Sequence, residues 1–145
     1  MGQQQLLLVI LVTIIVGIAT VVAINIFGTA AEQANRDAVS QDLLAAAAQA
    51  QAIYARPEMM NGAGGDFNNL DLEELLARLN IPGALGENAD ENRSQVNNEN
   101  GVYYISISNG GDGVLITGEP ESGGENITLD VHRDSDGVWQ FDWNE

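Results

Sequence analysis

The pattern of hydrophobic and polar positions sets the start of the chain apart from the rest. Residues 6–27 (LLLVILVTIIVGIATVVAINIF), here called the apolar segment, are almost wholly aliphatic, and no charged residue precedes Glu32. As a helix this segment would measure about 33 Å, at about 1.5 Å per residue, which is close to the thickness of the hydrocarbon core of a bilayer. We therefore predict a helix that is covered by lipid or by other protein.

The helical pattern continues beyond the apolar segment. Residues 29–56 are rich in Ala, Leu and Gln, which favour helices, and the first proline of the chain is Pro57. Apolar residues here recur at intervals of three and four, which is typical of a helix with one buried face. We predict one helix over residues 3–56, and the residues expected to pack it on the rest of the protein are Val39, Leu43, Ala46, Ala50 and Ile53.

The remaining residues, 57–145, are predicted to form one small acidic α+β head. Asp71 and Glu74 have the spacing of a capping box, which predicts a short helix. Its buried side chains are expected to be Leu72, Leu75, Leu76 and Leu79. Residues 84–101 are polar and show no period, so a surface loop is expected there.

Four later stretches have the patterns of strands, and turn-rich segments separate them at hairpin spacing. They cover residues 103–108, 114–117, 127–132 and 139–143, and Trp139 and Phe141 of the last are expected in the core. The predicted fold class is α+β, with the long N-terminal helix packed on a small antiparallel sheet of about four strands.

Charge and cysteine content restrict the function. Residues 57–145 contain 18 Asp and Glu against three Arg, so the head carries a formal charge of about −15, and the chain carries −16. Such a surface repels nucleic acids and anionic lipid headgroups. The chain contains no cysteine, which excludes disulfides and thiolate chemistry. The lack of lysine fits either a saline habitat or an ordinary acidic surface domain.

Candidate catalytic or ligand-binding residues are few, so we expect no enzyme, cofactor or metal site. His132 is the only histidine, and no serine or cysteine constellation accompanies it in the sequence. The Asp134-x-Asp136-Gly137 segment resembles part of a calcium loop, but a β-turn explains it better. Asn92 and Asn126 each begin an Asn-x-Ser/Thr motif, and Asn92 is the better candidate for glycosylation because it lies in the predicted loop.

The N-terminal architecture resembles the type IV pilin-like family of bacterial surface-filament subunits. The resemblance lies in the Gly2-Gln3 junction before an apolar helix, in residues 35–38 (NRDA) and 54–57 (YARP), and in the glycine-rich residues 60–67 (MNGAGGDF). Residues 100–105 (NGVYYI) resemble the start of a strand of that family. The match is good over residues 1–67 and loose beyond them.

The resemblance implies a structural rather than an enzymatic role. A prepilin peptidase would cut between Gly2 and Gln3, removing residues 1–2 as a leader, and pilus assembly machinery would transfer subunits from the inner membrane into an extracellular homopolymer. Many members carry an early glutamate that pairs with a neighbour's terminal amine. Here Leu7 occupies that place, and Gln3, Gln4 and Gln5 offer amide hydrogen bonds instead. The expected filament core contains Leu6, Leu7, Ile10, Ile14, Gly17, Val21, Ile24 and Phe27.

Two other functions remain open from the sequence. A single-span anchor carrying an extracellular binding module fits the same hydropathy, because hydropathy alone does not separate an anchor from a filament core. A minor pseudopilin of a secretion system also fits, since its architecture is the same.

Overall fold

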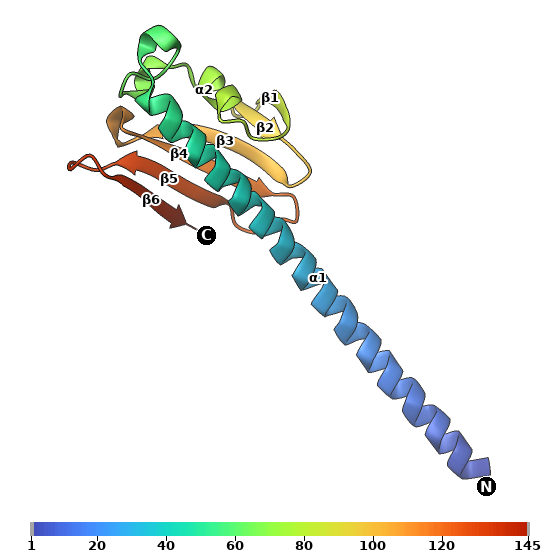
Figure 1. Ribbon diagram of the computed structural model, residues 1–145. Coiled ribbons are helices and arrows are strands. Elements are labelled where there is room, and N and C mark those ends of the chain that lie inside the picture. Colours follow the sequence, from blue (N-terminus) through green and yellow to red (C-terminus); the bar gives the residue numbers. More distant parts are fainter. Residues whose placement is uncertain (1, 145) are drawn as a thin grey trace. The chain divides into compact units, whose positions relative to one another are not determined.

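The computed structural model describes residues 2–144, and it confirms the α+β class (Figure 1). Helix α1 runs from Gly2 to Ala55 and is followed by a short helix α2, Leu72–Arg78. The chain separates into two compact units, one ending at Ala34 and one beginning at Asn35. The second of these, here called the head unit, includes the last part of α1, because that part of the helix belongs to its core.

The sheet of the head unit has six strands rather than the expected four. They are β1 Ala84–Asn88, β2 Arg93–Asn97, β3 Gly101–Ser108, β4 Gly113–Pro120, β5 Ile127–Arg133 and β6 Trp139–Asn144. All neighbours are antiparallel and follow the chain order from β1 to β6. Strands β3 to β6 are at the predicted positions, and their cross-strand pairs Ile105–Ile116 and Ile116–Leu129 place apolar side chains on one face.

The expectation of a surface loop over residues 84–101 is wrong, because this segment contains β1 and β2. These strands have little apolar alternation, and in β2 only Val96 is buried. Backbone pairing holds the pair together, with Glu87 opposite Ser94 and Asn88 opposite Arg93. Strand β1 is the edge of the sheet, and β2 pairs with β3 only through Val96 and Asn97. Polar side chains are tolerated on both faces at such a margin, so the sequence of this segment resembles that of a loop.

The core of the head unit lies between one face of the sheet and the last part of α1, which crosses that face (Figure 1). Tyr103, Ile116 and Leu129 contribute fully buried side chains from the sheet. Phe141 is 41% exposed, so its expected place in the core is wrong. The reason is its position on β6, the last strand of the sheet, which has only β5 as a neighbour.

The C-terminal end of α1 is closed by the glycine-rich segment that follows it. The backbone amides of Ala63, Gly64 and Gly65 donate to the carbonyls of Ile53, Arg56 and Tyr54, respectively. These bonds satisfy carbonyl groups that have no partner within the helix. Gly64 and Gly65 adopt left-handed backbone angles, with φ of 63° and 89°, which glycine adopts without steric cost.

Helix α2 begins as predicted, but without the capping box. Asp71 is the N-cap residue, yet its side chain makes no capping hydrogen bond. The carboxylate of Glu74 instead pairs with Arg78, one helical turn later. Leu75, Leu76 and Leu79 are buried as expected, whereas Leu72 is 40% exposed and does not belong to the core.

Candidate functional site

The apolar segment of α1 is the most unusual surface of the molecule. Its large aliphatic and aromatic side chains are all exposed, from 46% for Ile10 to 75% for Phe27. Among the described residues, α1 is the one helix that is long and apolar enough to cross a membrane. The segment therefore has the composition and length of a transmembrane helix.

All eight residues expected to form a filament core lie in this segment. Leu6, Leu7, Ile10, Ile14, Val21, Ile24 and Phe27 present exposed apolar side chains, and Gly17 leaves open space beside the helix. Other aliphatic residues, such as Leu8, Val12, Ile15 and Ile26, are equally exposed. Because these residues cover the full circumference of the helix, no side of the segment is adapted to water.

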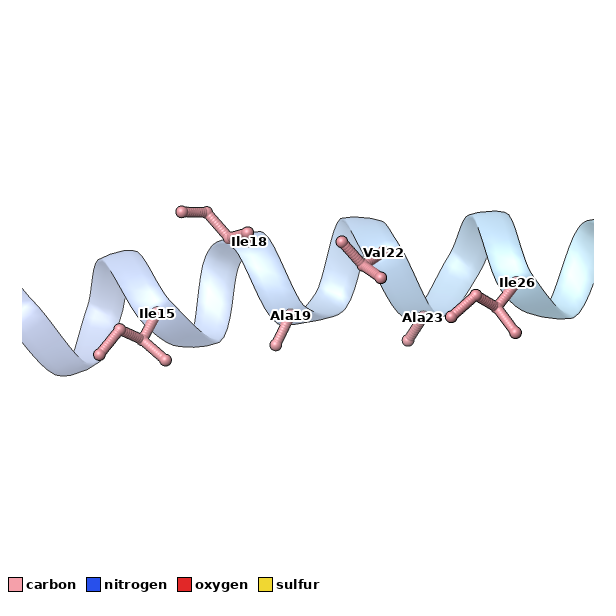
Figure 2. A pocket seen from close by; sticks show the side chains of 6 residues that line it. All are labelled: Ile15, Ile18, Ala19, Val22, Ala23 and Ile26. Atoms are coloured by element: carbon pink, nitrogen blue, oxygen red, sulfur yellow. The ribbon is translucent and has the colours of Figure 1, made fainter.

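A shallow groove interrupts this surface between Ile15 and Ile26 (Figure 2). Figure 2 shows Ala19 and Ala23 one helical turn apart, between the longer side chains of Ile15 and Ile26. Small residues of this kind allow two helices to approach closely in an apolar environment. The groove therefore results from the small side chains of these alanines, and almost all of its surface is apolar.

The hydroxyl groups within and just after the apolar segment are satisfied by its own backbone. Thr13 donates to the carbonyls of Val9 and Ile10, and Thr20 donates to that of Val16 at 2.7 Å. Thr29 donates to the carbonyl of Asn25 at 2.7 Å. These bonds let threonine enter an apolar environment without losing its hydrogen bond.

The two residues expected at a leader cleavage point, Gly2 and Gln3, form the start of α1 and are exposed. The other leader residue, Met1, lies outside the described residues. A peptide bond within a helix is not extended as protease substrates usually are, so cleavage here would require the first turn to unwind.

The packing residues of the amphipathic half of α1 lie against the sheet. Val39, Leu43, Ala46 and Ala50 have no exposed surface, and Ile53 is 4% exposed. Ala47 and Tyr54 are two further members of this face that the spacing of apolar residues did not predict, and they widen the stripe. Tyr54 places its ring 5.1 Å from those of Phe67 and Trp139.

A polar cluster on one side of this face was also missed. The carboxylate of Asp42 accepts hydrogen bonds from the Tyr103 hydroxyl at 2.6 Å, from Asn100 at 3.0 Å and from Asn98 at 3.3 Å. Burial, and then the hydrogen bond to Asp42, raise the pKa of Tyr103 above its usual range. The cluster joins α1 to the turn between β2 and β3, and its residues are too far apart in sequence to suggest it.

His132 lies on the opposite face of the sheet, half-buried between two carboxylates. Its Nδ1 atom is 3.6 Å from Asp130, and its Nε2 atom is 3.9 Å from Asp142. The Ser108 hydroxyl donates to Asp130 at 2.6 Å rather than to the imidazole, so Ser108 and His132 do not form a nucleophile–imidazole pair. The two carboxylates flank opposite ends of the ring, and within residues 2–144 no three His, Asp or Glu side chains converge on a point where a metal ion could bind.

The remaining candidates lie in turns. The Asp134 carboxylate accepts hydrogen bonds from the backbone amides of Val138 and Asp136 and from the side chain of Gln140. The bond from Val138 contributes most to lowering the pKa of Asp134. This carboxylate therefore organises the hairpin between β5 and β6. Asn92 is exposed in the turn between β1 and β2, with a left-handed φ of 48°.

Comparison of the chain with protein-family models, with curated proteins and with solved structures gives no match.

Proposed function

We propose that this protein is the structural subunit of an extracellular filament of the type IV pilin-like kind. The observation that carries the proposal is the apolar segment, which is uncharged and exposed over its whole circumference. A helix with this surface is stable in water only when other apolar groups cover it. In the proposed filament, the apolar segments of many copies cover one another.

The head unit supports the same role. It has a core of its own, formed by α1 from Val39 onward and by the sheet. The apolar segment contributes no residue to that core. The apolar segment is therefore available for assembly, while the acidic head unit keeps the assembled subunits soluble.

Before assembly, the proposed subunit resides in the inner membrane with the apolar segment as a single span. The length of the segment matches a bilayer, and the flanking residues are polar. A prepilin peptidase acting between Gly2 and Gln3, and an assembly machine, are the partners that this route requires.

The test is to introduce one charge into the apolar segment. Ile14→Arg places a guanidinium in the proposed filament core, and Leu44→Arg is the matched control, because Leu44 is an exposed apolar residue of the same helix within the head unit. We expect surface fibres by negative-stain microscopy for the wild type and for Leu44→Arg, and none for Ile14→Arg. Fibres of normal abundance from Ile14→Arg would contradict the proposal, and so would the absence of wild-type fibres.

Mass spectrometry of purified fibres tests the processing step separately. A subunit that lacks Met1 and Gly2 is the expected product. Intact Met1 on every subunit would exclude cleavage at this point and leave assembly itself untouched.

A single-span anchor that carries a binding module is the second candidate, since the same helix has the length and hydropathy of a membrane span. It predicts monomers in the membrane fraction and no polymer at any expression level. A minor pseudopilin of a secretion machine would instead be present in few copies, so counting subunits per cell separates it from a major filament subunit.

A further inference from the structure

Asn25 is the exceptional polar residue of the apolar segment. The hydroxyls of Thr13 and Thr20 bond to backbone carbonyls of their own helix, so they bring no unsatisfied donor into an apolar environment. The carboxamide of Asn25 makes no hydrogen bond to any other residue in the described range 2–144. Asn35, ten residues later, uses both ends of its carboxamide: its Nδ2 group donates to the Asn100 carbonyl, and its Oδ1 atom accepts from Ser122.

The environment of Asn25 changes between membrane and filament. In a bilayer, Asn25 lies near one end of the apolar segment, about 28 Å from Leu6 at about 1.5 Å per residue, so its carboxamide reaches the hydrated interface. In a filament core built from apolar segments, no water is available there. An unsatisfied carboxamide would then destabilise every subunit of the filament, because it loses its hydrogen bonds to water and gains none in return.

The same helix carries one set of carboxamides that could pair with that of Asn25. Gln3, Gln4 and Gln5 lie at the other end of the segment, and their carboxamides make no hydrogen bond to any described residue. A carboxamide presents both a donor and an acceptor, so two of them satisfy each other in a paired arrangement. The N–H groups of these four carboxamides are the side-chain donors of residues 2–27 that the helix itself leaves unbonded.

We propose that Asn25 of one subunit hydrogen-bonds a carboxamide of Gln3, Gln4 or Gln5 of a neighbouring subunit in the filament. This inference rests on the proposed function. Twenty to twenty-two residues separate Asn25 from these glutamines, which corresponds to about 30–33 Å along a helix. The pair therefore sets the axial offset between two neighbouring subunits at this value.

The apolar segment needs such a determinant. The side chains of residues 2–31 carry no charge, so no ion pair between side chains of this range fixes the register of one apolar segment against the next. Aliphatic surfaces alone are poorly specific in register, whereas one buried polar pair selects a single register at some cost in stability. Asn25 thus specifies the arrangement of subunits rather than driving their association.

Cysteine pairs test the offset directly, because the chain has no cysteine of its own. Filaments are assembled from wild-type protein doped with small amounts of Asn25→Cys and Gln5→Cys subunits, and then oxidised. We expect disulfide-linked heterodimers between position 25 and position 5, or positions 3 or 4 in the corresponding mixtures, because bridged Cα atoms must lie within about 7 Å. Asn25→Cys mixed with Val12→Cys is the control pair with a different spacing, and it is expected to give no heterodimer.

The outcomes separate this inference from the proposed function. If position 25 links only to position 25, neighbouring subunits have no axial offset. This result overturns the inference but leaves the proposed filament intact. Filaments in which position 25 links to none of positions 3, 4 and 5 also overturn it. If the wild-type chain forms no filament, both proposals fail.

A substitution series adds a readout that does not depend on cysteine. Asn25→Leu filaments are expected to assemble but to lose sharp helical layer lines in diffraction, whereas Ile24→Leu filaments keep them. A helical reconstruction of wild-type filaments shows directly which groups contact Asn25, even if every variant fails to assemble. The inference is wrong if the Asn25 carboxamide faces only aliphatic side chains in that map.

Discussion

At the scale of single residues, Asp42 connects the two layers of the head unit. Its carboxylate accepts three side-chain hydrogen bonds, and one of the donors is the fully buried Tyr103. Hydrogen bonds to a charged group contribute more than neutral ones, and a partner left without its bond keeps the cost of its desolvation. A polar cluster of this kind stabilises one arrangement of helix and sheet over others that bury similar apolar area.

Replacing Asp42 by Ala is expected to lower the free energy of unfolding of the head unit by about 2 kcal/mol, because the Tyr103 hydroxyl and the Asn100 carboxamide lose their acceptor. The Asn98 carboxamide keeps its hydrogen bond to the Pro82 carbonyl. Asp37→Ala is the matched control, since Asp37 is exposed on the same helix. Urea unfolding of the full chain in detergent, followed by the fluorescence of Trp139 and Trp143, measures both. Equal stabilities of the two variants would contradict the role of Asp42.

Tyr103 makes the head unit less stable as the pH rises into the alkaline range. The raised pKa of Tyr103 means that the folded state favours the neutral phenol. Above pH of about 10 the unfolded chain loses this proton more readily, so the stabilisation is complete below that pH and decreases as the pH rises further. Between pH 8 and pH 11, the urea midpoint of the wild type is expected to fall relative to that of Tyr103→Phe, which has no phenol to ionise. A difference that does not change over this range would exclude the linkage.

At the scale of elements, α1 and the sheet approach closely where small residues face each other. Ala46, Ala47 and Ala50 lie on the buried face of the helix, and Gly118 lies on β4 beneath Val39. A Cβ atom at position 118 would lie 2.5 Å from a methyl carbon of Val39 and 3.3 Å from the ring of Tyr103. The absence of a side chain at Gly118 therefore determines how closely the helix packs.

Gly118→Ala is expected to destabilise the head unit by about 1–3 kcal/mol, the usual cost of overpacking a core. Gly86→Ala on the edge strand β1 is the control, because an added Cβ there meets no atom closer than 3.9 Å. Thermal unfolding followed by near-ultraviolet circular dichroism measures both variants. If Gly118→Ala melts at the wild-type temperature, Val39 and Gly118 do not pack so closely that a Cβ atom is excluded.

The elements differ in how well the sequence predicted them, and the cause is the source of their stability. Helix α1 and strands β3 to β5 depend on regular apolar burial, which leaves a period in the sequence. Strands β1 and β2 depend on backbone pairing at the edge of the sheet, and the Asp42 cluster depends on residues more than fifty positions apart. Neither kind of interaction produces a local pattern. Phe141 alternates like a core residue, but its exposure follows from the end position of β6, which only the full sheet defines.

At the scale of the whole molecule, the chain combines an uncharged apolar segment with a strongly acidic remainder. Residues 57–145 carry 18 acidic and three basic side chains. Apolar burial between copies favours assembly and is largely insensitive to charge, whereas the acidic surfaces repel one another when copies come together. The balance of these two effects determines the conditions under which a filament is stable.

Filament stability is expected to rise with ionic strength for this reason. The screening length falls from about 30 Å at 0.01 M salt to about 3 Å at 1 M, so the repulsion between neighbouring acidic surfaces is removed at high salt. The fraction of subunits that sediments as fibres after heating, measured at 10 mM and at 1 M NaCl, is expected to be larger at 1 M. Neutralising three exposed acids, one on β1 (Glu87→Gln) and two in the turn between β1 and β2 (Asp90→Asn and Glu91→Gln), should reduce this difference. If the sedimenting fraction is the same at both salt concentrations, repulsion between the acidic surfaces does not limit assembly.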